Sequence, residues 1–109
     1  MIKLLLPLVL LFTSLTCFGV TSTAEQIKEW RQLAEQGHAN GQNHLGIMYS
    51  FGRGVPEDLV FAYMWWNLAA AQGHETAKKN KNSRSKVMTK EQIAEGQKLS
   101  REWLAKRQE

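Results

Sequence analysis

The sequence predicts an all-α protein, a short solenoid of about five antiparallel helices that ends in a C-terminal capping helix. The first observation behind this prediction is an internal repeat, because residues 30–38 align with residues 66–74, with Trp, Ala, Gln, Gly and His in register. A repeat offset of this size is typical of stacked helix–turn–helix units. The second observation is that segments with apolar residues at helical spacing alternate with glycine turns and capping residues.

A first helix should end at Gly37, because glycine readily takes the left-handed conformation just past a helix end. Its apolar stripe consists of Ile27, Trp30, Leu33 and Ala34. A second helix should run from about Ala39 to Ser50. Its expected buried side chains are Leu45, Met48 and Tyr49. Gly41 and Gly46 are poor helix formers, which indicates that another part of the chain approaches closely there.

Gly52 and Gly54 predict a tight loop with positive φ angles, after which Asp58 can cap a third helix that runs to about Gln72. That helix is apolar almost all round, so it should be buried on more than one side. Two interpretations apply to its stripe of Phe61, Met64 and Leu68. The favoured one is that the C-terminal helix covers the stripe, and the other is a groove for a helix of a partner.

The last third of the chain predicts two more helices. A short one should span about Glu75 to Arg84. A longer one should start at a capping box, in which Thr89 caps the helix and Gln92 closes the box, and should run to about Arg107. Its amphipathic face makes it suitable as the cap that closes the open end of a solenoid.

Residues 39–74 closely resemble the Sel-one-like repeat, a relative of the tetratricopeptide repeat, which implies a tetratricopeptide-like superhelix. The positions that carry the resemblance are Leu45, Gly46, Tyr49, Gly52, Gly54, Val55, Asp58, Ala62, Trp65, Ala69, Ala70 and Gly73. Residues 25–38 then form an N-terminal half repeat, and residues 75–109 form a degenerate repeat with the capping helix.

Residues 1–24 have the layout of a secretory signal peptide, with Lys3 before an apolar run from Leu4 to Phe12 and a small, polar stretch up to Ala24. Cleavage is expected between residues 19 and 24, which predicts a bacterial protein of the periplasm or one secreted from the cell. The alternatives are a retained membrane anchor, a buried core helix and a lipoprotein modified at Cys17.

Loss of that segment leaves about 85 residues and no cysteine, so dense packing must replace disulfides, and Trp30, Trp65, Trp66 and Trp103 should supply much of it. Charge is uneven, because residues 25–76 carry a net charge of −3 whereas residues 77–109 carry +6. The basic stretch of residues 78–86 could meet an anionic partner or the envelope surface, or it could simply be solvated. Nucleic acid is not expected, because no aromatic residue interleaves with these lysines.

Catalysis is not expected. Residues 83–86 match S-x-x-K, but the further motifs of penicillin-binding enzymes are absent. His38 and His74 occupy equivalent repeat positions and His44 has no partner at helical spacing, so no metal site and no cofactor are predicted.

The predicted function is therefore a non-catalytic protein–protein interaction module of the bacterial envelope, an adaptor or regulator. The alternatives are a cell-wall or β-lactam hydrolase, which some members of the family suggest, and a secreted factor that acts on a host. In tetratricopeptide-like repeats the first helix of each pair lines the concave side. That resemblance predicts contact with a partner protein, and with an acidic segment of it, through Asn40, Asn43, His44, Ile47, Lys78, Lys79 and Lys81.

Overall fold

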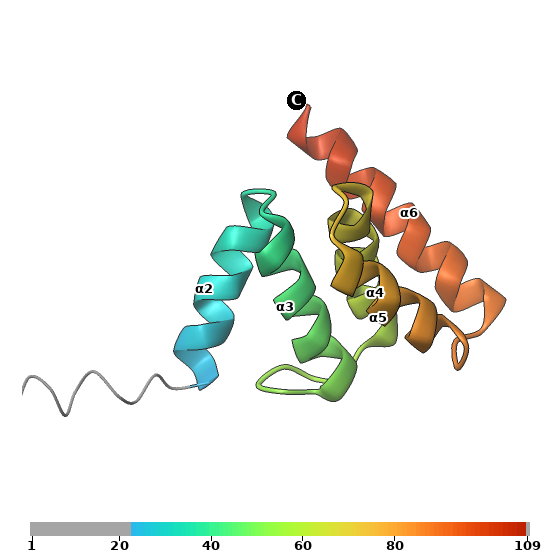
Figure 1. Ribbon diagram of the computed structural model, residues 1–109, viewed down its shortest axis with the longest axis horizontal. Coiled ribbons are helices and arrows are strands. Elements are labelled where there is room, and N and C mark those ends of the chain that lie inside the picture. The colour runs from blue at the N-terminus through green and yellow to red at the C-terminus, as the bar shows by residue number, and fades with distance from the viewer. Residues whose placement is uncertain (1–22, 109) are drawn as a thin grey trace, which may run out of the picture.

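The computed structural model describes residues 23–108, in which five α-helices follow one another and no strand occurs (Figure 1). The helices are α2 (Thr23–Glu35), α3 (Ala39–Phe51), α4 (Leu59–Ala71), α5 (Glu75–Ser85) and α6 (Lys90–Arg107). All five predicted helices are present, and the all-α helical-repeat fold is confirmed. The predicted signal peptide, except for its last two residues, and Cys17 lie outside the described residues.

Helix α4 lies at the centre of the molecule, because α3, α5 and α6 all pack against it, while α2 packs against α3. Its two consecutive tryptophans serve two separate parts of the core. Trp65 lies in a cluster with Ala34, Leu45, Met64 and Leu68, against which Leu99 and Trp103 of α6 also pack. Trp66 lies on the other side with Ala62, Ala69 and Ala77, where α5 joins. The prediction of a helix buried on more than one side is thus confirmed.

The C-terminal helix covers most of the stripe predicted on α4, but not all of it. Met64 and Leu68 are buried beneath α6. Phe61 is 40% exposed and stacks on Tyr49 of α3 with 5.4 Å between ring centroids. The capping box is present at the start of α6, where Thr89 Oγ1 accepts from Gln92 N–H and the Gln92 side chain accepts from Thr89 N–H.

The far end of α6 is anchored to the end of α2. Trp103 Nε1 donates to a carboxylate oxygen of Glu35 at 3.2 Å, and Arg107 donates to the Glu35 carbonyl oxygen at 3.0 Å. A carbonyl in the last turn of a helix has no partner within that helix, so the guanidinium satisfies a group that would otherwise depend on solvent. These bonds hold the first and last described helices together across the end of α4.

Two glycines act where the sequence predicts close approach and a tight loop. A Cβ atom on Gly46 would lie 2.5 Å from Trp66 Nε1, so only glycine lets the indole reach the Asn43 carbonyl, to which it donates at 3.2 Å. In the loop, Gly54 has φ +74°, a conformation that L side chains rarely adopt, and a Cβ there would collide with Ile27 of α2. The loop after α3 therefore packs back onto α2.

Candidate functional site

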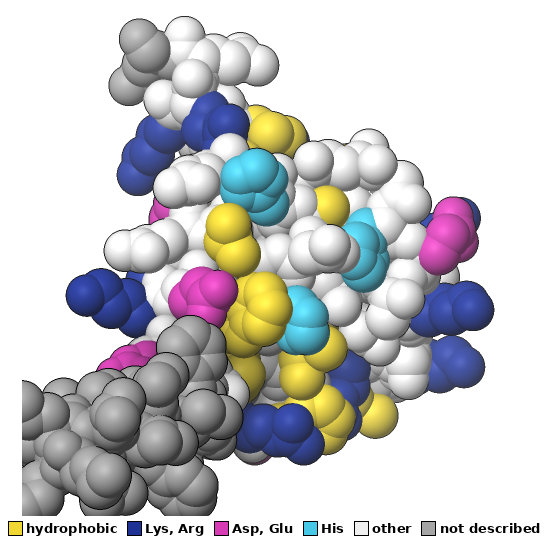
Figure 2. Space-filling model, turned by 60° about the vertical axis from the view of Figure 1, so that its left-hand side comes forward, with side chains coloured by type: hydrophobic (Ala, Val, Ile, Leu, Met, Phe, Trp, Pro, Cys, Tyr) yellow, Lys and Arg dark blue, Asp and Glu magenta, His cyan; other side chains and the backbone are white. Residues whose placement is uncertain are grey.

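One stripe of α3 is only partly covered by the other described helices. Asn40, His44, Ile47 and Phe51 follow one another at intervals of four, three and four residues, which places them on one side of the helix. Asn40 and Phe51 are exposed, while His44 and Ile47 are half-buried. We call these four residues the α3 stripe. Figure 2 shows this side of the molecule, with the three histidines in cyan and hydrophobic side chains in yellow between and below them.

Aromatic stacking orients His44 within the stripe. The imidazole lies parallel to the indole of Trp30 from α2, with 3.9 Å between centroids and 16° between planes. Burial lowers the pKa of His44 below its usual value, and the nearby His74 lowers this pKa further. One face of the His44 imidazole therefore lies against Trp30, and its partial burial disfavours the charged form.

His74 connects the stripe to α5. Its Nδ1 atom accepts from the backbone N–H of Ala77 at 3.1 Å and so caps α5, while its Nε2 atom lies 2.9 Å from Asn40 Oδ1. Because Nδ1 accepts, the proton of a neutral His74 must lie on Nε2 and point at the Asn40 oxygen. His38, the equivalent residue before α3, makes no such side-chain cap.

Two further polar contacts link α3 with α5. Asn80 Nδ2 donates to Asn43 Oδ1 at 3.2 Å, and Arg84 Nε donates to Ser50 Oγ at 2.8 Å. Asn43 is only 6% exposed as a result. The candidate partner-binding set therefore loses Asn43, whose amide serves the contact between the two helices.

The three candidate lysines of α5 do not share one face. Lys78 and Lys79 are exposed. Lys81 instead turns toward α4, where its Nζ donates to Asn67 Oδ1 at 3.2 Å and lies 5.8 Å from the centre of the Tyr63 ring. The candidate set loses Lys81 as well, because this ammonium points away from the α3 stripe. The sequence already indicated that Lys81 turns inward. The 36-residue repeat offset places Lys81 at the position equivalent to Leu45, which is buried.

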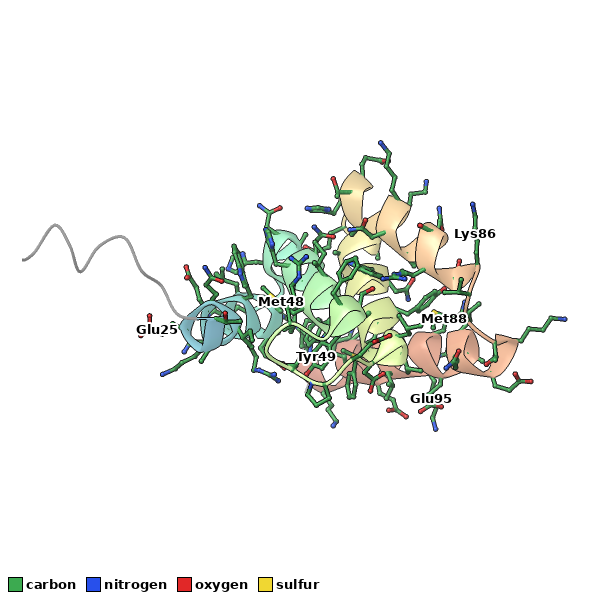
Figure 3. All side chains as sticks on the ribbon, turned by 90° about the horizontal axis from the view of Figure 1, so that it is seen from below. Glu25, Met48, Tyr49, Lys86, Met88 and Glu95 are labelled. Atoms are coloured by element: carbon green, nitrogen blue, oxygen red, sulfur yellow. The ribbon has the colours of Figure 1, made fainter. Side chains whose placement is uncertain are left out.

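A hollow of about 220 Å³ opens at the lower end of the stripe, between α3 and α5. We call it the α3–α5 hollow, and its lining residues are Ile47, Phe51, Trp66, Asn80, Ser83 and Arg84. Its α3 and α4 side is apolar, whereas its α5 side is polar. Figure 3 views the molecule from below, with Tyr49 beside the loop that follows α3 and with Lys86 and Met88 at the turn between α5 and α6.

Two guanidinium groups lie close to the ring of Phe51, which lines this hollow. Arg53 lies 5.2 Å and Arg84 4.8 Å from the centre of its ring, and Phe51 itself is 56% exposed. Within residues 23–108 neither arginine forms an ion pair with a carboxylate, and the ion pair found there joins Lys98 and Glu102 of α6. Phe51, Arg53 and Arg84 were not predicted as site residues. An exposed aromatic residue next to the predicted glycine loop, with an arginine two positions on, was the available signal.

Other parts of the described chain offer little for chemistry. No three His, Cys, Asp or Glu side chains in residues 23–108 gather closely enough to hold a metal ion. No helix in this part of the chain is long and apolar enough to cross a membrane. A second hollow of about 340 Å³, lined by Gly37, Gln72, Trp103 and Arg107 among others, lies where α2, α4 and α6 meet, on residues that also hold those helices together.

The family comparison agrees with this architecture. Residues 39–74 match the Sel1 repeat, a range that includes α3, α4 and the glycine turn that follows each of them. Sel1 repeats generally mediate protein–protein interaction. No curated protein matches the chain.

Proposed function

We propose that this chain, which carries one Sel1 repeat, is an exported, non-catalytic interaction module of the bacterial cell envelope that binds another protein through the side of α3 and α5. The observation that supports this most directly is the α3 stripe, where amide, imidazole, isoleucine and phenylalanine side chains follow one another along one side of a helix, and where Asn40 and Phe51 are exposed. Polar and apolar side chains aligned in this way on a partly exposed side of a repeat helix suit the recognition of a peptide segment.

The charge of the region favours an acidic partner. Arg53 and Arg84 lie beside Phe51, Lys78 and Lys79 are exposed on α5, and none of the four forms an ion pair with a described carboxylate. Exposed charges attract a partner over a distance that salt limits to about 8 Å at physiological ionic strength. The interaction should accordingly be weak and should fall as salt is added.

A pair of charge reversals tests the proposed face. Crosslinking in the native envelope would first identify a captured protein, and its purified form would then be titrated against the wild-type chain and against Lys78→Glu plus Lys79→Glu. We expect the double variant to bind several-fold more weakly, with unchanged thermal unfolding, because both lysines are exposed.

The matched control is Lys90→Glu plus Lys106→Glu, which makes the same charge change on exposed positions of α6. If both double variants weaken binding equally, only net charge matters and the proposed face is wrong. If neither variant and no addition of salt changes the affinity, the acidic partner is wrong as well.

A separate experiment tests the proposal that the protein is exported. The proposal draws on Lys3, the apolar run from Leu4 to Phe12 and the small residues up to Ala24. Because α2 begins at Thr23, cleavage after Gly19 or Ser22 would leave that helix whole. The intact mass of the protein from an envelope fraction decides the matter, since a full-length mass or a lipid on Cys17 would contradict a soluble exported form.

A further inference from the structure

We propose that the α3–α5 hollow is a docking site for the carboxyl-terminal residue of a partner protein, whose apolar side chain enters the hollow while its terminal carboxylate pairs with Arg84. This inference rests on the proposed interaction function and specifies the chemistry of one end of the face. It concerns the end at Phe51, which lies three turns of helix from Asn40.

The size and lining of the hollow suit a single apolar side chain of a bound peptide. Its volume of about 220 Å³ is several times the space of about 30 Å³ that a water molecule occupies. It is nevertheless smaller than the range of about 300–1,000 Å³ that is usual for small-molecule pockets. Ile47, Phe51 and Trp66 provide apolar walls, and burying an apolar group against them is favourable.

Arg84 is oriented by contacts within the chain, but no described carboxylate pairs with it. Its Nε atom donates to Ser50 Oγ at 2.8 Å, which fixes the plane of the guanidinium, and the ring of Phe51 supports one face. The two terminal nitrogens are not among the hydrogen bonds of the described residues, and no described carboxylate pairs with Arg84. A guanidinium oriented in this way can bind a carboxylate through two parallel hydrogen bonds. Arg53 adds a second positive charge within 5.2 Å of the centre of the same Phe51 ring.

Chain geometry favours a terminal carboxylate over the side chain of Asp or Glu. Because Arg84 itself lines the hollow, the carboxylate and the apolar group must lie close together. In an extended peptide successive side chains point to opposite sides, so an acidic residue next to an apolar one directs its carboxylate away from the hollow. The last residue of a chain carries its carboxylate and its side chain on the same Cα atom, so both can reach this site together.

The test uses two synthetic hexapeptide probes with an acetylated N-terminus, four alternating glycines and serines, one alanine and a last leucine. One probe ends in a free carboxylate and the other in a carboxamide. Both are titrated into the ¹⁵N-labelled protein. We expect the free acid to shift the indole N–H signal of Trp66 and the Nε–H signal of Arg84, and to bind about 10- to 100-fold more tightly than the amide, as the loss of a hydrogen bond to a charged group implies.

Two variants and a control locate the effect. Arg84→Gln should reduce the affinity for the free acid to that for the amide, and Phe51→Ala, at an exposed position, should weaken both probes. Arg101→Gln removes the same charge from an exposed position of α6 and should change neither affinity by more than about twofold, because exposed charges farther away than about 8 Å are screened. Thermal unfolding of each variant shows that the fold is retained.

Equal binding of acid and amide, or full affinity of Arg84→Gln, would overturn the inference and leave the arginine with a purely intramolecular contact to Phe51. Absence of any shift with the free acid would overturn it too. Neither result bears on the proposed interaction function, which the captured partner and the lysine reversals test independently. Tighter binding of an amidated probe with an internal Asp would identify an internal acidic segment instead and would also overturn the inference.

Discussion

Helices α4 and α5 lie side by side, but different forces hold them. Helix α4 buries seven of its 13 residues, among them Trp65, Trp66 and Leu68. Helix α5 buries only Ala77 among its 11 residues. Its position depends on the hydrogen bonds of four side chains. Asn80 and Arg84 bond to side chains of α3, and Lys81 bonds to a side chain of α4. His74 bonds to a side chain of α3 and also caps the first turn of α5.

The difference shows how a degenerate repeat can still dock. Apolar burial is not directional and scales with area, so the large apolar surface of α4 holds it through many contacts at once. A hydrogen bond requires a short distance and a good angle, and each contributes only about 0.5–1.5 kcal/mol net. Helix α5 is therefore the element most easily displaced, and it carries half of the proposed contact surface. The following substitutions should affect the two helices unequally.

The largest effect is expected for Trp65→Ala in the core beneath α6. Trp65 is 4% exposed and packs edge-on to Trp103 with 5.9 Å between centroids. Its truncation should lower the free energy of unfolding by roughly 3–5 kcal/mol, measured by urea denaturation. Trp30→Ala removes a half-buried indole and should cost less. A loss below about 1 kcal/mol for Trp65→Ala would contradict the central place of α4.

Gly46→Ala should be the next most harmful change. Helix propensity alone favours alanine by about 1 kcal/mol, but the new Cβ would meet Trp66 Nε1 at 2.5 Å. Overpacking of this kind typically costs about 1–3 kcal/mol, so we expect net destabilisation in urea.

A double-mutant cycle isolates the cause. In the background of Trp66→Phe, which removes the indole N–H, Gly46→Ala should cost less than in the wild type, because the contact has been relieved. Equal costs in the two backgrounds would show that Gly46 is needed for another reason.

A smaller, local effect is expected for His74→Ala. The substitution removes the side-chain cap of α5 and should cost about 1 kcal/mol, with faster amide exchange confined to residues 75–85. His38→Ala is the matched control, because this histidine precedes α3 at the equivalent position and makes no side-chain cap. Similar losses for both variants would mean that the cap is not the cause.

The smallest effect is a pH dependence at His44. Burial first, and the neighbouring His74 second, lower the pKa of His44 in the folded state. The unfolded chain then binds more protons than the folded one as the pH falls below about 6.5, so stability should decrease from that pH toward the lower folded pKa. Urea denaturation at pH 7.5 and 5.5 measures the decrease, and His44→Gln should reduce it. An unchanged decrease in that variant would assign the effect to another group.

Helix boundaries were predictable from the sequence because their signals are local. Gly37, Gly52 and Gly73 follow helices, and Asp58 and Thr89 precede them, and each conformation or cap depends on residues a few positions away. Three residues of the α3 stripe, Asn40, His44 and Ile47, followed from helical spacing and the repeat resemblance, whereas Phe51 did not. The exposure of the neighbouring residues could not be predicted, because Asn40 and Asn43 carry the same amide. Asn43 bonds to Asn80 and is buried, whereas Asn40 bonds to His74 and stays exposed.

The sequence by itself thus determined the five helices, the 36-residue repeat and the apolar helix at the centre, because period, capping and turn residues act within a few positions of the chain. The tertiary structure alone decided that Lys81 turns to Asn67, that Asn43 is buried, and that Phe51, Arg53 and Arg84 meet at one hollow. Contacts between side chains of separate helices depend on how those helices pack, because a partial rotation of one helix about its axis, or a shift along it, would bring different residues together.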